Sequence, residues 1–231
     1  MESKLFTPVT FGPLTLRNRT IRSAAFESMC PGNAPSDMLL DYHRSVAAGG
    51  IGMTTVAYAA VTQSGLSFDR QLWMRPEIIP GLRRLTDAIH AEGAAAGIQL
   101  GHCGNMSHKS ICGCMPVGAS SGFNLYSPTF VRGLRADELP EMARAYGRSV
   151  NLAREAGFDS VEIHAGHGYL ISQFLSPSTN HRKDEFGGSL QNRMRFMDMV
   201  MEEVMKAAGR NWTRRCRWPG GWSSREHMRW S

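Results

Sequence analysis

The chain has 231 residues, of which 42% are hydrophobic and 20% charged, a composition typical of a globular protein and not of a disordered or fibrous one. No apolar run approaches the ~20 residues of a membrane helix and the N-terminus lacks a signal core, so we expect a cytoplasmic protein with no membrane contact. Residues 210–231 hold six arginines and one glutamate, a net charge of +5, which leaves about +1 of the total of +6 for the first 209 residues. A nucleic-acid partner would depend on those last residues alone, and we expect none.

The pattern of apolar residues predicts a hairpin followed by alternating strands and helices. Two short apolar runs flank Gly12-Pro13 and predict the hairpin near the N-terminus. Each helix that follows has a glycine just past its predicted end, as is common at helix C-termini. The expected strands are residues 20–25, 51–56, 94–100 and 159–163, the last of them buried, and the expected helices are 41–48, 80–92, 137–156 and 191–208.

This alternation predicts an α/β protein with parallel strands and right-handed crossovers. A doubly wound sheet usually carries a glycine-rich phosphate loop after its first strand, and residues 23–28 (SAAFES) are not such a loop. We therefore favour a (β/α)8 TIM barrel. A complete barrel takes ~250 residues and eight strands, so this chain is predicted to hold only about the first four βα units plus the hairpin, with the first and fourth strands as open edges.

The last 22 residues do not fit this fold. Four of the five tryptophans lie after residue 210, in a segment without Leu, Ile or Val or any periodicity. One hypothesis is an Arg/Trp-rich binding arm. The favoured one is a shifted reading frame, because codons exist for which the frame one base earlier reads ELDEALQVARRLVEQGAHAL, an amphipathic helix, a glycine turn and the start of a strand. We accordingly expect residues 1–209 to form the barrel part and 210–231 to be a non-native tail.

The five cysteines are too few and too irregular for a disulfide framework. Cys112-Gly113-Cys114 lies close in sequence to Cys103, His102 and His108, which suggests a metal site. The CxC spacing is not the usual CxxC, however, and no second pair follows at the distance of a zinc site. We expect no metal.

Three side chains that can donate a hydrogen bond or a proton follow the fourth predicted strand: His164, His167 and Tyr169. Polar residues at the end of a parallel strand are the usual mark of an active site in a barrel. The i, i+3 spacing of the histidines would bring them together if a helical turn begins at the strand end. The alternative is that the histidines tie the loop to backbone carbonyls and that the tyrosine is a packing ring.

The motif EIHAGHGYLISQFLSPSTNHRKDEFGGSLQNRMRF, residues 162–196, resembles the signature of the Old Yellow Enzyme family, the FMN-dependent NADH:flavin oxidoreductases and ene-reductases. LFTPVTFGPLTLRNRTIRSA and GIQLGHCGN resemble the same family's N-terminal hairpin and third-strand motif, so the similarity runs from about residue 4 to 209. The resemblance implies a barrel that holds FMN at the carboxyl ends of its strands. It also implies NADH or NADPH as the reductant and a small-molecule enone as the acceptor.

The resemblance further assigns roles to individual residues. His164 and His167 would hold the carbonyl oxygen of the acceptor, because two imidazole donors stabilise the enolate charge that develops there. Tyr169 would deliver the proton to the α-carbon as a general acid.

The cofactor would be bound by small and amide side chains. Gln99 would hydrogen-bond the flavin pyrimidine, since an amide both donates and accepts. The backbone of Ser23, Ala24 and Ala25 would meet the isoalloxazine ring, and His164 would also lie against the cofactor.

The family binds the FMN phosphate with loops after the seventh and eighth strands, beyond the four units predicted here. Two function classes therefore stay open. One is an active FMN-dependent oxidoreductase, for which a homo-oligomer is a candidate assembly. The other is an inactive truncated fragment, or a half-barrel that needs a partner.

Overall fold

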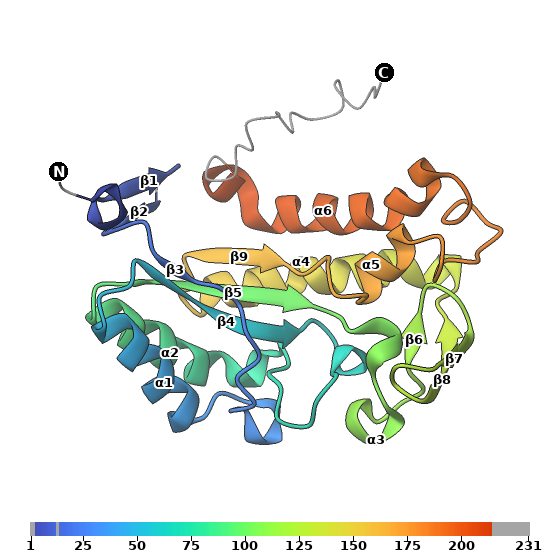
Figure 1. Ribbon diagram of the computed structural model, residues 1–231, viewed down its shortest axis with the longest axis horizontal. Helices are drawn as coiled ribbons and strands as arrows, with labels where there is room; N and C mark the ends of the chain where they lie inside the picture. The colour runs from blue at the N-terminus through green and yellow to red at the C-terminus, as the bar shows by residue number, and fades with distance from the viewer. Residues whose placement is uncertain (1–2, 13, 214–231) are drawn as a thin grey trace.

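A four-stranded parallel sheet forms the centre of the protein (Figure 1). The computed structural model describes residues 3–12 and 14–213. Within these residues the strands lie side by side in the order of the sequence, and each pair of neighbours is parallel. The strands are β3 (Ile21–Arg22), β4 (Met53–Ala60), β5 (Ala95–Gly101) and β9 (Ser160–Ile163). The predicted order of four parallel strands is thus confirmed.

Four long helices follow the four strands and cover the sheet. In Figure 1, α1 and α2 lie below the sheet and α6 lies above it. α1 packs against α2, and α4 packs against α6. The helices are α1 (Asp37–Ala48), α2 (Ile79–Ala91), α4 (Leu139–Glu155) and α6 (Leu190–Thr213).

Capping and pairing explain where the element bounds differ from the prediction. α1 begins four residues before the expected position 41, because the Ser36 hydroxyl accepts a hydrogen bond from the Leu39 amide at 3.2 Å. The first strand is shorter than predicted, since only Ile21 and Arg22 pair with β4. The helix expected to start at residue 137 opens with a 3-10 turn, Ala136–Glu138, before α4.

The N-terminal hairpin is present as predicted. β1 (Val9–Phe11) pairs antiparallel with β2 (Leu14–Leu16), and the hydroxyls of Thr10 and Thr15 lie 3.0 Å apart across it. A 3-10 turn, Lys4–Phe6, precedes the hairpin. In Figure 1 the hairpin lies at the end of the sheet where the strands begin, opposite to the end where they finish.

The segment between β5 and α4 contains structure that the sequence did not predict. It forms a short helix and a small three-stranded sheet, which Figure 1 shows beyond the tips of β4 and β5. Another short helix, α5, follows β9. The bounds are α3 (Lys109–Cys112), β6 (Val117–Gly118), β7 (Gly122–Asn124), β8 (Thr129–Gly133) and α5 (Leu170–Leu175), and the remaining 3-10 turns are Pro31–Asn33, Gln63–Gly65, Pro76–Ile78 and Gly104–Met106.

The two faces of β5 differ in their surroundings. Ala96, Ile98 and Leu100 are fully buried under the helices and belong to the main hydrophobic core. Residues 97, 99 and 101 alternate with them and point to the opposite face, as successive residues of a strand do. That face corresponds to the interior of a barrel.

The sheet has two edges among the described residues, β3 and β9. The prediction that β9 is buried is wrong: Glu162 is exposed and the other residues of the strand are partly exposed. The reason is that β9 pairs only with β5 in the part of the chain that the structure describes.

The backbone leaves the helical conformation at Gly209 (φ 67°, ψ 167°), where the fourth helix was predicted to end, although α6 is assigned through Thr213. Residues 214–231 of the predicted non-native tail lie outside the described residues, so that hypothesis stays a prediction. No helix in the ranges 3–12 and 14–213 is both long and apolar enough to span a membrane.

Candidate functional site

The turn that follows β9, residues 164–169, carries the three predicted catalytic side chains. Its first residue, His164, continues the sheet, because its amide donates to the Leu100 carbonyl at 2.8 Å. His167 and Gly168 then adopt left-handed conformations, with φ of 55° and 69°. The helical turn expected at the strand end is therefore not formed, and α5 begins only at Leu170.

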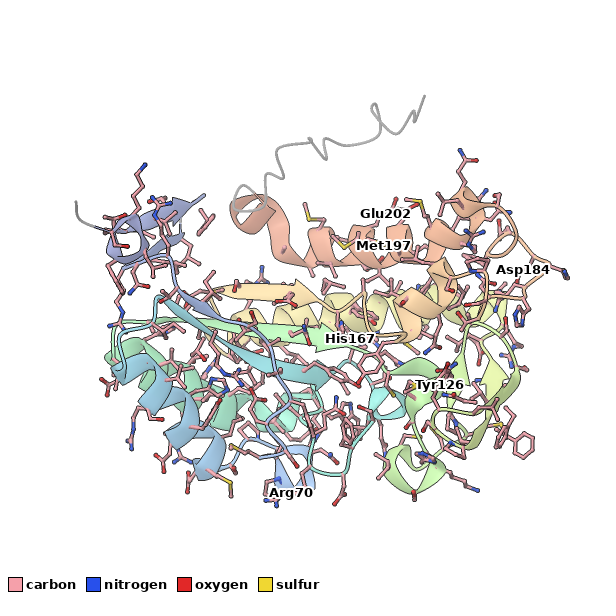
Figure 2. The ribbon with its side chains drawn as sticks, viewed as in Figure 1. Arg70, Tyr126, His167, Asp184, Met197 and Glu202 are labelled. Atoms are coloured by element: carbon pink, nitrogen blue, oxygen red, sulfur yellow. The ribbon has the colours of Figure 1, made fainter. Side chains whose placement is uncertain are left out.

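This left-handed turn nevertheless brings the two histidines and the tyrosine together. His164 Nε2 lies 3.2 Å from His167 Nδ1. The ring of Tyr169 lies 4.9 Å from that of His164 and 6.4 Å from that of His167, measured between centroids. Figure 2 shows His167 at the carboxyl ends of the central strands. The three side chains thus share one edge of the sheet.

The hydrogen bonds of the turn define which imidazole nitrogens carry protons. The Gly166 amide donates to His164 Nδ1 at 3.4 Å, so His164 carries its proton on Nε2 and donates it to His167 Nδ1. The Nε2–H of His167, which is an exposed residue, is then directed away from this pair. The two imidazoles are therefore linked in series, with the donor of His167 left for a ligand.

Burial sets the protonation of this group. It lowers the pKa of His164, with a smaller contribution in the same direction from His167, so His164 is neutral near pH 7. Burial also raises the pKa of Tyr169, which keeps its phenol protonated. A neutral hydrogen-bond donor and a protonated phenol are the forms needed for oxyanion binding and for proton donation.

Tyr58 is a site residue that the sequence analysis missed. Its ring lies 5.8 Å from the ring of His164 and 5.4 Å from that of Tyr169. Its hydroxyl donates to the Gly65 carbonyl at 2.8 Å, which holds the ring in place. The signal that could have found it is an aromatic residue near the carboxyl end of the second strand, in TTVAYAAV.

Gln173 is a second missed residue and connects the turns after β5 and β9. This buried amide donates to the Cys103 carbonyl at 3.1 Å and to the Gly168 carbonyl at 2.6 Å. It accepts from the Asn105 amide at 3.1 Å. A glutamine in the apolar stretch LISQFL was the available signal.

A cavity of about 560 Å³ opens between the β9–α5 turn and the β6–β8 segment. His167 and Gly168 form part of one wall, and Tyr126 and Phe123 form part of the opposite wall. Figure 2 shows Tyr126 on the β6–β8 segment. The volume lies within the range of about 300–1,000 Å³ that is usual for small-molecule sites.

The residues expected to bind the cofactor lie at the same edge. Ser23, Ala24 and Ala25 directly follow β3, and Ser23 and Ala25 are exposed. Gln99 lies two residues before the end of β5, not at its end as expected, and its Nε2 donates to Glu162 Oε1 at 2.6 Å. The amide is therefore oriented by a neighbouring carboxylate.

The segment after β3 is held by a buried ion pair. Arg22 NH1 lies 3.0 Å from Glu27 Oε1, and the Glu27 side chain is 4% exposed. The Ala57 amide donates to Glu27 Oε2 at 3.3 Å. The small residues 23–25 lie between the two members of this pair and are therefore fixed at both ends.

The histidines of the possible metal site have other partners. His102 accepts from the Gly104 amide at 2.9 Å and lies 3.0 Å from the Ser64 hydroxyl. His108 Nε2 lies 2.6 Å from the Ser127 hydroxyl. Within the described residues, no three His, Cys, Asp or Glu side chains are grouped as metal ligands.

Comparison with known proteins finds one family and many relatives. The sequence model of the NADH:flavin oxidoreductase / NADH oxidase family matches residues 4–217. The 4,4'-dithiodibutanoate disulfide reductase of Rhodococcus erythropolis is 42% identical over 205 residues, which cover 89% of this chain and 51% of the relative. The NADPH dehydrogenase of Bacillus subtilis is 37% identical over 209 residues, 88% of this chain and 60% of the relative.

Solved structures agree with this match. The Old Yellow Enzyme homologue from Zymomonas mobilis superposes with a TM-score of 0.84 at 30% identity, over 90% of this chain and 61% of that one. Morphinone reductase in complex with tetrahydroNAD gives 0.83 at 28% identity, over 91% and 62%. The chain thus spans about half to three fifths of the length of these proteins, and its fold is the corresponding part of a TIM barrel.

Proposed function

The chain belongs to the NADH:flavin oxidoreductase / NADH oxidase family, and on this premise we propose that its β9–α5 turn is the acceptor site of an FMN-dependent NAD(P)H oxidoreductase. The proposed reaction reduces the C=C bond of an α,β-unsaturated carbonyl compound. The observation that carries the proposal is the contact between His164 and His167, 3.2 Å between ring nitrogens, with the Tyr169 ring beside them.

The donor set at the edge of the sheet fits a flavin. Gln99 offers an amide oriented by Glu162, and residues 23–25 offer small side chains that allow a planar ring to approach the backbone closely. When bound, FMN would supply the hydride that adds to the β-carbon of the acceptor. The described residues contain the first four strand–helix units, whereas the family's phosphate-binding loops follow strands seven and eight.

The residues of the turn would act on the acceptor itself. The Nε2–H of His167 would hydrogen-bond the carbonyl oxygen, and His164 Nε2–H would turn from His167 to the same oxygen. Two such donors stabilise the negative charge that develops there. Tyr169 would give its phenolic proton to the α-carbon, and its raised pKa keeps that proton available at neutral pH.

The test is made on purified protein loaded with FMN. We expect bound FMN to be bleached by NADPH and its colour to return when 2-cyclohexenone is added. The Tyr169→Phe variant removes the proton donor, so we expect enone-driven reoxidation to slow by about 10²–10⁴-fold with the NADPH step unchanged. Tyr146→Phe is the matched control, because Tyr146 is buried on α4, outside the lining of the cavity, and its hydroxyl has no hydrogen-bond partner among the described residues.

Two results would contradict the proposal. One is reoxidation by the enone at the same rate in Tyr169→Phe and in the unchanged protein. The other is a flavin that NADPH reduces but that no enone reoxidises. A small organic disulfide should be tested as a second acceptor, because a relative is named for reducing 4,4'-dithiodibutanoate.

A second candidate is a half-barrel that becomes active only with a complementary half. The observation that favours it is the pair of open edges at β3 and β9 in the described residues. A colourless protein that does not quench FMN fluorescence would support this candidate. Recovery of flavin binding on adding a polypeptide with the other four βα units would establish it, and flavin binding by the chain alone would exclude it.

A further inference from the structure

The turn after α3 holds two cysteine thiols side by side, outside the site described above. Cys112 is the last residue of α3, and Gly113 follows it in a left-handed conformation with φ of 71°. This turn brings Cys114 Sγ to 3.7 Å from Cys112 Sγ. In Figure 1, α3 lies beside the β6–β8 segment. A disulfide bond of about 2.05 Å would need only a modest movement of the two sulfurs.

The two thiols differ in access to solvent. Cys112 is 1% exposed, and its thiol donates to the Cys114 carbonyl at 3.2 Å. Cys114 is exposed. A dissolved reagent can therefore reach Cys114 but not Cys112. The Cys112 sulfur lies close enough to attack the Cys114 sulfur once that sulfur has reacted. This is the arrangement of an attacking thiol and a resolving thiol.

The other cysteines of the described residues lack this arrangement. Cys30 is 4% exposed, and Cys103 is 0% exposed with its thiol donating to the Leu66 carbonyl at 3.4 Å. The nearby His108 Nε2 lies 2.6 Å from the Ser127 hydroxyl, and among the residues that the structure describes no group of metal ligands includes the pair. The thiols of Cys112 and Cys114 are therefore free to react with each other or with a small molecule.

We propose that Cys112 and Cys114 form a reversible dithiol–disulfide pair that reacts with small-molecule disulfides. The Cys114 thiolate attacks one sulfur of the small disulfide, forms a mixed disulfide and releases one thiolate. The Cys112 sulfur then attacks Cys114 Sγ, its proton passes to the departing small-molecule thiolate, and the second thiol is released. Two protein thiols are oxidised and one small disulfide is reduced to two thiols, so the electrons balance without FMN or NADPH.

The geometry of the motif also makes the protein disulfide easy to reduce. A bridge between residues i and i+2 closes a very short ring, and strained disulfides have more oxidising potentials than relaxed ones, so glutathione disulfide must be in large excess to oxidise the pair fully. Gly113 has no Cβ and already occupies the left-handed region, so the turn can adjust as the sulfurs approach. Excess dithiol should therefore restore both thiols.

The pH dependence of the reaction follows from the state of Cys114. Burial raises the pKa of this thiol to about 11, the neighbouring Cys112 adds to that rise, and Arg132 opposes it. Because only the thiolate attacks, the rate of modification should rise about tenfold per pH unit between pH 7 and 9.

The experiment treats the full chain with glutathione disulfide, in a Cys216→Ser background and without NADPH or FMN. Trypsin separates the described cysteines into peptides 23–44, 85–109 and 110–132, and the last contains both members of the pair. We expect peptide 110–132 to lose two hydrogens, to carry no lasting glutathionyl group, and to regain both hydrogens with dithiothreitol.

Two variants separate the roles of the thiols. Cys112→Ser should keep one glutathionyl group on Cys114, because the resolving thiol is gone. Cys114→Ser should stay unmodified, because Cys112 is buried. Circular dichroism checks that each variant is folded. The mass of peptide 110–132 from the protein with both cysteines tests the proposal even if a variant does not fold.

Three outcomes would overturn the proposal: a lasting glutathionyl group on Cys114 of the unchanged pair, no reaction of peptide 110–132, or a bond that links it to the Cys103 peptide. None of these depends on flavin binding, so failure here is distinct from failure of the proposed function.

Discussion

Two turns at the same edge of the sheet each begin with a histidine, yet they differ in what those histidines do. His102 follows β5 and is 0% exposed, and both of its ring nitrogens have protein partners, Gly104 and Ser64. His164 follows β9, and within the described part of the chain its Nε2 has His167, an exposed residue, as its one partner. A histidine at a strand end is thus a candidate for binding a ligand when its hydrogen-bond partner is exposed to solvent. It is a structural residue when both of its ring nitrogens bond to other protein groups.

The largest effect expected from this difference is acid sensitivity at His102. Burial lowers its pKa from 6.5 to about 3, so the unfolded chain takes up a proton at a higher pH than the folded one. The contribution of neutral His102 to stability is complete above pH 6.5 and is lost as the pH falls towards 3. At about 1.36 kcal/mol per unit, roughly 3 kcal/mol should be lost between pH 7 and 4.

Urea denaturation at the two pH values measures this loss. The matched control is His102→Gln, which keeps an amide for hydrogen bonding but has no group that titrates. Its stability should depend less on pH than that of the unchanged protein. Equal pH dependence in both proteins would show that His102 is not the acid-sensitive group.

The next effect concerns the link between the two turns. Gln173→Leu leaves the Gly168 carbonyl and the Asn105 amide without a partner and removes one of two donors to the Cys103 carbonyl, so we expect a loss of about 1–3 kcal/mol in the free energy of unfolding. Gln191→Leu is the control, because Gln191 is exposed on α6. Urea denaturation compares them, and a similar loss in both would mean that the buried amide does not tie the turns together.

The smallest effect is expected at Tyr58. Tyr58→Phe keeps the ring beside His164 and Tyr169 but removes the hydrogen bond to the Gly65 carbonyl, a change of about 1 kcal/mol. Thermal unfolding measures it, with Tyr126→Phe, at a 93% exposed position, as the control. An unchanged melting temperature in Tyr58→Phe would show that the hydroxyl does not hold the ring.

Local patterns predicted the parallel sheet and its helices. Apolar periodicity shows where a helix or strand lies, and glycines such as Gly49 and Gly93 mark where a helix ends, and both signals depend on only a few neighbouring residues. The proximity of His164, His167 and Tyr169 was also expected, since all three follow one strand. The left-handed backbone at His167 was not, because only a few per cent of non-glycine residues adopt this conformation, and the enrichment of histidine there is too small to predict it.

Contacts between residues far apart in the sequence could not be predicted from the sequence alone. Gln99 and Glu162 are 63 positions apart, and only the pairing of β5 with β9 brings them within 2.6 Å. The bonds of Gln173 to the turn after β5 span a similar separation. The exposure of β9 likewise follows from its place at the sheet edge and not from its composition.

The most direct test of the difference between the two turns is the rate at which an enone reoxidises the NADPH-reduced, FMN-loaded protein. We predict that His164→Ala and His167→Ala each slow this step by about 10²–10³-fold, because each removes a donor to the carbonyl oxygen. His102→Gln should lower stability and leave the rate unchanged. A His164→Ala protein as fast as the unchanged one, or an equally slow His102→Gln, would contradict the assignment of the acceptor site to the turn after β9.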